Sequence, residues 1–370
     1  MRKTLFVMFD FPPKPGGAQR YNWDMVRAFP KDKVVILAPR WENWEEFDAK
    51  SGYATYRLPW GWMEKLTIPI LMLTAPYIAA RHGVEQIWFS KYSRLIYFTT
   101  VITSNLLRLP FGMTIFGEDL AWASDDFGIR VPRIAFALRN TVLKKARHIV
   151  ANSHYSGSLI PAGIAFSVIH PCTERITAVS NSAHQREAKC VTYLSVGQLT
   201  HKKAFDLVIK ALALGLPGVP NYRYVICGSG PEKHSLTELI RTLGMGGAVL
   251  IISNASEEVK SELYQQADVF VMPSRIEGFG IAFLEAALHG VCSVGSQTGG
   301  IPEAVEDGVT GILVQTEDIQ GLRNALAILG SDKQLREQMG EAARMRCERH
   351  FLWDRFAAEW CLVFDHQICK

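Results

Sequence analysis

Residues 269–290 read V-F-V-M-P-S-R-I-E-G-F-G-I-A-F-L-E-A-A-L-H-G, so that an apolar run, a glycine-rich turn and an apolar helical pattern follow one another. The run at 269–273 predicts a buried strand, and Gly278 and Gly280 open the backbone where the helix begins. In open α/β sheets, ligands bind in loops beyond the carboxyl ends of the strands. We therefore expect the loop that carries Glu277 to face a ligand.

Apolar β-rich runs alternate with helical patterns through the rest of the chain. This alternation predicts an α/β protein with parallel sheets covered by helices on both faces. In the first half, strands are expected at 4–9, 33–38, 86–90, 112–116, 148–152 and 167–170. In the second half, strands are expected at 191–196, 222–227, 248–252, 269–273, 291–295 and 311–314. Each half is expected to form a doubly wound domain.

The length of 370 residues fits two domains better than one compact core. A polar segment with little periodicity at 174–189 is the expected linker, which divides the chain into domains at 1–172 and 173–349. Beyond residue 331 the pattern is helical, with apolar residues at positions 351, 352, 356, 360 and 363.

Composition and cysteine usage exclude several classes of protein. The chain is 48% hydrophobic and 21% charged, which is typical of a globular protein and excludes overall disorder. The seven cysteines form no C-x-x-C pair, so neither a disulfide framework nor a zinc site is expected. The apolar run before Asp10 is too short for a signal peptide, and the apolar stretch 66–80 is too short to span a membrane. We expect a cytoplasmic protein in which 66–80 forms a buried or interfacial helix.

Charge is unevenly distributed between the halves. Residues 1–170 contain 21 Lys and Arg against 13 Asp and Glu, whereas residues 171–370 contain 19 against 23. A basic N-terminal half that faces a membrane surface or a polyanionic acceptor is one explanation, and chance distribution is the other.

Glu277 and Glu285 are eight residues apart, which places them on similar faces but about 10 Å apart along the chain. That spacing is unfavourable for two carboxylates that act on one scissile bond. It suits two carboxylates that bind different hydroxyl groups of an extended ligand, with glycine N–H groups on phosphates between them. A solvated Glu285 is the alternative, disfavoured because the helix around it is strongly apolar.

Three further loops follow expected strands. F-P-P-K-P-G-G-A-Q-R brings Gly16 and Gly17 to a helix start expected at Ala18, which suits a diphosphate. V-G-Q-L-T-H-K-K places Lys203 ahead of a helix, and V-I-C-G-S-G-P-E contains Gly228 and Gly230. A tight turn for the glycines and a solvated pair for Lys202 and Lys203 are the alternatives.

The E-x7-E element, T-G-G-I-P-E-A-V-E-D-G-V-T-G-I-L-V at 298–314, the G-S-G-P-E turn and D-F-P-P-K-P-G-G together resemble the family-four retaining glycosyltransferases of the GT-B fold. Within that family the chain looks most like bacterial mannosyltransferases that act on phosphatidylinositol mannosides and related lipid-linked acceptors. The resemblance implies two Rossmann-like domains that face a cleft. It also implies a C-terminal helix, within 350–370, that crosses back to the N-terminal domain.

The resemblance also implies a role for particular residues. Glu277 would contact the transferred sugar, Glu285 the ribose and Lys203 the diphosphate of a GDP- or UDP-linked donor. Backbone donors for the phosphates and further donor contacts would come from Gly16, Gly17, Gly197, Gln198, Gly228, Gly230, Gly278, Phe279, Gly280 and Ile281. Contacts with sugar or acceptor would come from Arg20, Phe116, Gly117, Glu118 and Asp119. No metal or other cofactor is expected, because basic side chains and helix termini supply the positive charge.

Three positions depart from the family pattern. Gln198 stands where an arginine is usual, and Phe116 stands where a histidine is usual, so one cation and one donor are missing. Arg20 or Lys14 is a candidate to compensate for the lost charge. Ala204 replaces the usual glycine after Lys203, a change expected to cost little.

The function implied is transfer of mannose or another hexose, with retention and without a metal, to a glycan or lipid-linked acceptor. Two alternatives stay open: a non-catalytic subunit that binds nucleotide sugars, and a sugar-nucleotide epimerase. Four tryptophans at 41–62 and the basic N-terminal half favour a peripheral membrane contact through that domain, at the inner face of the plasma membrane. No nucleic acid is expected among the partners.

Overall fold

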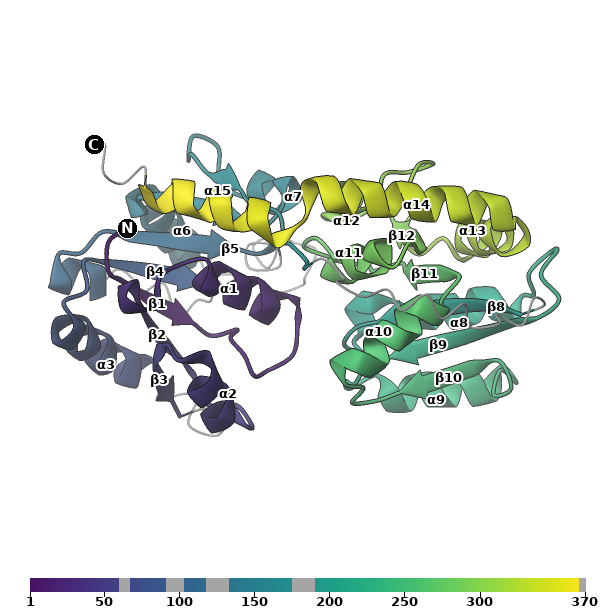
Figure 1. Ribbon diagram of the computed structural model, residues 1–370, viewed down its shortest axis with the longest axis horizontal. Helices are drawn as coiled ribbons and strands as arrows, with labels where there is room; N and C mark the ends of the chain where they lie inside the picture. The colour runs from purple at the N-terminus through teal and green to yellow at the C-terminus, as the bar shows by residue number, and fades with distance from the viewer. Residues whose placement is uncertain (60–66, 91–102, 118–132, 175–189, 366–370) are drawn as a thin grey trace. The chain divides into compact units, whose positions relative to one another are not determined.

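The computed structural model describes residues 1–59, 67–90, 103–117, 133–174 and 190–365 (Figure 1). The chain divides into two compact units, residues 1–172 with 353–370 and residues 173–352. Each unit is built around one parallel sheet with helices on both faces, as the alternating pattern predicted.

Among the described residues, the sheet of unit 1 has seven strands in the order β3-β2-β1-β4-β5-β6-β7, and every pair is parallel. The strands are β1 (Thr4–Met8), β2 (Val34–Pro39), β3 (Ala54–Leu58), β4 (Gln86–Ser90), β5 (Phe111–Ile115), β6 (His148–Ala151) and β7 (Ser167–Val168). The described helices of this unit are α1 (Gly17–Arg27), the short 3-10 turn η1 (Lys31–Lys33), α2 (Trp44–Ser51), α3 (Thr67–His82), α6 (Arg133–Lys145), α7 (His154–Ser158) and α15 (Trp353–Asp365). The sequence patterns missed β3, because this edge strand is largely half-exposed and carries Thr, Tyr and Arg.

Successive residues of β1 point to opposite faces of the sheet and enter two different cores. Leu5 and Val7 pack in a cluster that also contains buried residues of α3 and α6. Phe6 and Met8 pack in a second cluster with α1 and α15. Both faces of the sheet are therefore closed by helices.

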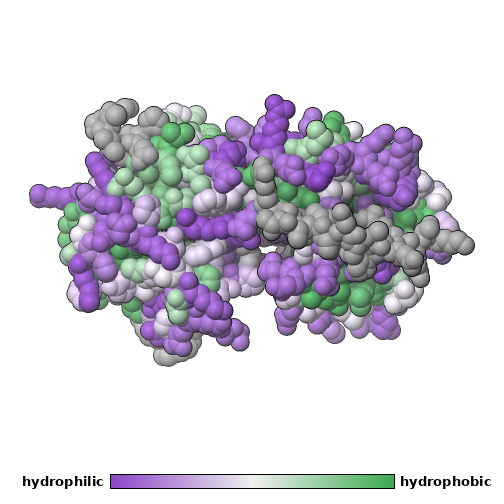
Figure 2. All heavy atoms as spheres, viewed as in Figure 1, coloured by the Kyte–Doolittle hydropathy of each residue, from purple (hydrophilic) through white to green (hydrophobic). Residues whose placement is uncertain are grey.

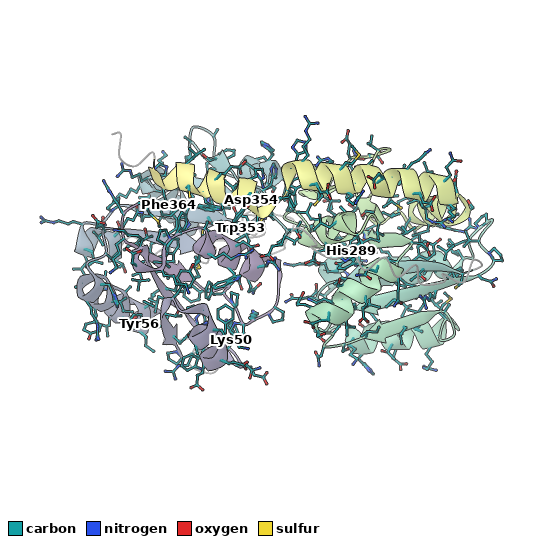
Figure 3. The ribbon with its side chains drawn as sticks, viewed as in Figure 1. Lys50, Tyr56, His289, Trp353, Asp354 and Phe364 are labelled. Carbon is teal, nitrogen blue, oxygen red and sulfur yellow. The ribbon has the colours of Figure 1, made fainter. Side chains whose placement is uncertain are left out.

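The C-terminal helix α15 belongs to unit 1, which confirms the expected return to the N-terminal domain. Its buried face is made by Phe356, Trp360 and Phe364, and the Trp360 ring meets Trp88 of β4 at 5.3 Å between centroids. Figure 3 labels Trp353 and Phe364 near the two ends of this helix. Phe351 and Leu352 precede the helix and pack in the core of unit 2 instead.

Helix α3 covers the stretch expected to be a buried or interfacial helix. Leu71, Ala75 and Ile78 are buried against the sheet, whereas Leu73 and Tyr77 are exposed. In the part of the chain that the structure describes, no helix is both long enough and apolar enough to cross a membrane.

In residues 190–352 the sheet of unit 2 has six parallel strands in the order β10-β9-β8-β11-β12-β13. The strands are β8 (Val191–Val196), β9 (Tyr222–Cys227), β10 (Val249–Ile252), β11 (Val269–Met272), β12 (Cys292–Ser296) and β13 (Gly311–Val314). The helices are the short 3-10 turn η4 (His201–Lys203), α8 (Phe205–Ala213), α9 (Lys233–Thr242), α10 (Glu257–Gln266), α11 (Ile281–Leu288), α12 (Ile301–Ala304), α13 (Ile319–Ser331) and α14 (Lys333–His350). The strand order reverses at β8, so the loops after β8 and β11 lie at the switch point where such sheets bind ligands.

Candidate functional site

The loops after β8 and β11 meet at the switch point of unit 2. The backbone N–H of Arg275, three residues beyond β11, donates to the Lys202 carbonyl at 2.8 Å. The two loops are therefore joined through their main chains, and they bring Lys203 and Glu277 together.

Lys203 and Glu277 form an ion pair in which Lys203 Nζ donates to Glu277 Oε2. The side chains are 23% and 14% exposed, so the pair is half-buried but still open to solvent. The alternative in which Lys203 is an ordinary solvated residue does not agree with this contact. The Lys203 cation and the Glu277 carboxylate therefore lie side by side in the region where the sequence predicted a donor site.

The turn that carries Lys203 ends in an unusual backbone conformation. Ala204 has φ 56° and ψ 33°, which is the left-handed region that favours glycine. A non-glycine residue there costs about 1–2 kcal/mol, because its Cβ approaches the following carbonyl oxygen. The expectation that Ala204 costs little was therefore wrong.

Glycines on the loop after β9 allow the backbone to pack closely around this site. A Cβ on Gly228 would lie 1.8 Å from the Gly197 carbonyl oxygen, and one on Gly230 would lie 2.4 Å from the Leu199 oxygen. Leu199 N–H donates to the Ser229 carbonyl at 2.9 Å across the same contact. Gly228 and Gly230 thus have a packing role of their own, and their contact with a donor stays a prediction.

The T-G-G turn after β12 supports the Glu277 loop in the same way. A Cβ on Gly299 would lie 2.0 Å from the Glu277 carbonyl oxygen, and one on Gly300 would lie 2.2 Å from that of Gly278. Gly300 N–H donates to the Glu277 carbonyl at 3.0 Å. The position of Glu277 therefore depends on two neighbouring loops.

Helix α11 starts directly after this loop, at Ile281. Its N-cap is Gly280, with φ 94°, and no side chain caps the helix. The amide groups of the first turn and the helix dipole give this end a partial positive charge, which suits an anion. The Phe279 side chain is buried and meets the Phe351 ring at 5.6 Å, so only its backbone is available to a ligand.

Glu285 lies half-buried on α11 and is held by a tyrosine that no sequence motif indicated. Tyr264 of α10 is 2% exposed, and its hydroxyl donates to Glu285 Oε2 at 2.8 Å. Burial, together with the nearby Glu285 charge, raises the pKa of Tyr264 well above its usual value. The Tyr264 hydroxyl therefore stays protonated and serves as a hydrogen-bond donor.

His289 contacts both residues of this pair, Tyr264 and Glu285. Its ring stacks on Tyr264 with 5.3 Å between centroids and 20° between planes. Its Nδ1 lies 2.8 Å from the Glu285 carbonyl, and its Nε2 lies 3.2 Å from Ser261 Oγ (His289 is labelled in Figure 3). Glu285 is thus a positioned carboxylate and not a solvated helix residue.

Gly16 and Gly17 lie at the start of α1 in unit 1. The helix begins at Gly17, one residue before the expected start, and Gly16 is its N-cap with φ 149°. Gln19 Nε2 donates to Asp10 Oδ1 at 2.9 Å, and Asn22 Nδ2 donates to the Asp10 carbonyl at 2.6 Å. The first two turns of α1 are therefore tied to the beginning of the loop that follows β1.

The other predicted contacts in unit 1 are engaged in packing and ion pairs. Arg20 Nε lies 3.0 Å from Asp24, which is buried, and the Phe116 ring meets Tyr21 edge-on at 5.3 Å. Gly117 is buried beside Tyr155. Glu118 and Asp119 lie outside the described residues, as do two of the four tryptophans, Trp60 and Trp62.

Lys14 and Arg20, the candidates to compensate for the missing arginine, each interact with another side chain. Lys14 Nζ lies over the Trp41 ring, 4.4 Å from its centroid, and Arg20 pairs with Asp24. Gln198 itself is exposed on the loop after β8. Compensation by Lys14 or Arg20 stays a prediction.

Most of unit 2 is similar to a known protein family. Residues 180–346 match the family described as glycosyl transferases group 1. The chain is 28% identical to a GDP-mannose-dependent alpha-(1-6)-phosphatidylinositol monomannoside mannosyltransferase from Mycolicibacterium smegmatis. The match covers 94% of this chain and 94% of that protein. The chain is 26% identical over 97% of both chains to the protein of the same name from Mycobacterium tuberculosis.

Solved structures of the same architecture cover nearly the whole chain. Anabaena Alr3699/HepE in complex with UDP and glucose has a TM-score of 0.81 at 20% identity and covers 99% of this chain and 100% of its own. Sucrose-phosphate synthase from Thermosynechococcus elongatus has a TM-score of 0.83 at 18% identity and covers 99% of both chains. The chain therefore has the GT-B fold, and its residues 180–346 are similar to the glycosyl transferases of group 1.

Proposed function

We propose that this protein is a retaining mannosyltransferase that uses GDP-mannose and a glycan or lipid-linked acceptor without a metal ion. The observation that carries the proposal is the Lys203–Glu277 pair beside the uncapped N-terminus of α11. Mannose and the lipid-linked acceptor rest on relatives whose names refer to GDP-mannose and phosphatidylinositol monomannoside.

The positive groups of unit 2 suit a departing diphosphate. When the bond between the sugar anomeric carbon and the β-phosphate oxygen breaks, negative charge grows on the diphosphate. Lys203 and the amide groups at the start of α11 can stabilise that charge, which lowers the barrier as well as favouring binding. The acceptor hydroxyl forms the new bond on the face that the diphosphate leaves, and its proton passes to the diphosphate. No separate general base is then required.

The two carboxylates would bind the two ends of the donor. Glu277 accepts hydrogen bonds from hydroxyl groups of the sugar, and Glu285 accepts them from the ribose. The hydrogen bond from Tyr264 occupies one oxygen of Glu285 and fixes the orientation of the other.

A non-catalytic subunit that binds nucleotide sugars is the second candidate. Gln198 carries no charge, and Phe116 packs against Tyr21 and offers neither a donor nor a charge. Calorimetry and a transfer assay separate the two candidates. A binding subunit takes up the donor but neither transfers its sugar to an acceptor nor releases the nucleotide.

The first test combines calorimetry with a transfer assay. We expect the purified protein to bind GDP-mannose in preference to UDP-glucose or UDP-N-acetylglucosamine, and to transfer mannose to phosphatidylinositol mannosides. Lys203→Ala should lower the transfer rate about 100-fold or more, because one donor to a developing charge is lost. Binding of none of the three donors, or a wild-type rate in the variant, would contradict the proposal.

A second test uses the ion pair in the free protein. Glu277→Gln frees Lys203 from its partner and removes a negative charge beside the phosphates. We expect it to bind free GDP about tenfold more tightly, a change of about 1.4 kcal/mol, while its transfer rate falls. Calorimetry with GDP measures the first effect. Weaker GDP binding in this variant would mean that Glu277 and the diphosphate do not compete for Lys203.

A third test concerns the tyrosine behind Glu285. Tyr264→Phe keeps the buried ring and removes only the hydrogen bond to the carboxylate. We expect the KM for the donor to rise about three- to tenfold with kcat little changed, because a ribose contact is equally strong in the ground and transition states. Tyr224→Phe is the matched control, because that buried hydroxyl bonds Ser195 in the same unit. An equal change in both variants would indicate a general effect of the lost hydroxyl.

Peripheral contact with an anionic membrane through unit 1 is part of the proposal. Leu73 and Tyr77, one turn apart on α3, are 76% and 60% exposed, and Arg81 Nη1 donates to the Tyr77 hydroxyl at 3.1 Å. Apolar side chains beside a cation fit the boundary between lipid headgroups and acyl chains. The face seen in Figure 2 mixes hydrophobic and hydrophilic residues.

Sedimentation with liposomes tests this contact. We expect binding to vesicles rich in phosphatidylglycerol at low salt, weaker binding at high salt, and little binding to phosphatidylcholine. Leu73→Asp with Tyr77→Asp should weaken the binding, whereas Leu250→Asp, at a 56% exposed position of unit 2, should not. No sedimentation with the anionic vesicles at low salt would rule the contact out.

A further inference from the structure

Arg275 lies in the loop between β11 and α11, two residues before Glu277, and its side chain is 14% exposed. Its guanidinium donates two parallel hydrogen bonds to Asp206, from Nη1 to Oδ1 at 2.9 Å and from Nη2 to Oδ2 at 3.1 Å. Nε donates to Glu317 Oε1, and Nη1 donates to the His201 carbonyl at 2.7 Å. One side chain therefore links three segments of unit 2.

Two of the contacts of Arg275 fall on the turn that carries Lys203. The side chain donates a hydrogen bond to the carbonyl of His201, and the backbone N–H donates one to the carbonyl of Lys202 at 2.8 Å. Lys203 is the next residue, so the two carbonyls directly before it are fixed from the opposite loop. The bonds to Asp206 fix the first turn of α8, just beyond Lys203.

The turn itself needs such support. Its last residue before α8, Ala204, has the left-handed conformation that an alanine adopts only at a cost. Strained conformations persist when the surrounding contacts determine them. Arg275 supplies contacts on both sides of Ala204, at His201, Lys202 and Asp206.

The charges near Arg275 indicate that this residue has a structural role and does not bind a phosphate group of the donor. Two carboxylates, Asp206 and Glu317, surround its one positive charge. Burial opposes ionisation of Asp206, but the hydrogen bonds from Arg275 and Lys210 outweigh it and lower the pKa of Asp206 to about 2. Asp206 therefore stays charged at neutral pH and holds the guanidinium in place.

We propose that Arg275 is a positioning residue that fixes the turn of residues 201–204, so that Lys203 meets the diphosphate of the donor. This inference rests on the proposed role of Lys203 in transfer. Arg275 acts on the reaction only through Lys203 and does not itself touch the donor.

The test compares Arg275→Lys with Arg336→Lys. Lysine keeps the charge but loses the planar fork that reaches Asp206 and His201 together. Arg336 is a matched control, because it is 12% exposed, lies within 3.8 Å of Asp268 and donates to the carbonyls of Leu329 and Gly330 in the same unit. We expect kcat/KM to fall about tenfold in Arg275→Lys and to stay near the wild-type value in Arg336→Lys.

A double-variant cycle shows whether the effect passes through Lys203. In a Lys203→Ala background, adding Arg275→Lys should change kcat/KM less than about twofold, because the positioned group is already gone. A full tenfold further loss would show that Arg275 acts independently of Lys203. An unchanged rate in Arg275→Lys alone would overturn the proposal as well.

Hydrogen exchange gives a readout that does not depend on activity. We expect amides of residues 200–205 to exchange about tenfold faster in Arg275→Lys than in the wild type, with no such change in Arg336→Lys. Unchanged exchange in these amides would overturn the positioning role, whatever the reaction is. Failure of the proposed function is seen separately, as wild-type protein that neither binds nor consumes a nucleotide sugar.

Discussion

Parallel pairing of β8 with β11 is the constraint on which the site depends. The two strands are neighbours in the sheet and run in the same direction, so the loops that follow them leave the same edge. Lys203 and Glu277 are 74 residues apart in the chain, yet this pairing brings them to one place. No local preference of either loop could do so.

Close approach of four backbone segments follows from that pairing. The loops after β8, β9, β11 and β12 share one edge of the sheet, and main-chain hydrogen bonds join neighbouring loops at Leu199, Arg275 and Gly300. Such contacts leave no room for a Cβ at Gly228, Gly230, Gly299 or Gly300. The glycines of these motifs are therefore explained by packing within the protein, before any ligand is considered.

Much of this architecture could be predicted from the sequence, because buried parallel strands are continuous apolar runs and each is followed by a helix. β3 was missed because an edge strand is half-exposed and its pattern is polar. Glu277 lies on a loop and Glu285 on the helix that follows it, as the sequence pattern predicted. Tyr264 could not be found, because its contact with Glu285 depends on how α10 packs against α11. Arg275 lies in the motif of residues 269–290, but its partners Asp206 and Glu317 are distant in sequence. Periodicity and spacing therefore could not predict these contacts.

The ion pair also bears on how the proposed enzyme would distinguish a complete donor from its product. In the structure, Lys203 and Glu277 satisfy each other, so a diphosphate that takes Lys203 leaves Glu277 without its cation. A half-buried carboxylate that loses its partner is unfavourable unless hydroxyl groups replace it. In the proposed reaction a nucleotide sugar brings both a diphosphate and a sugar, and so would satisfy both residues at once. The nucleotide left after transfer satisfies only Lys203. Re-formation of the pair would then favour release of the product, so that one contact would serve both donor recognition and turnover.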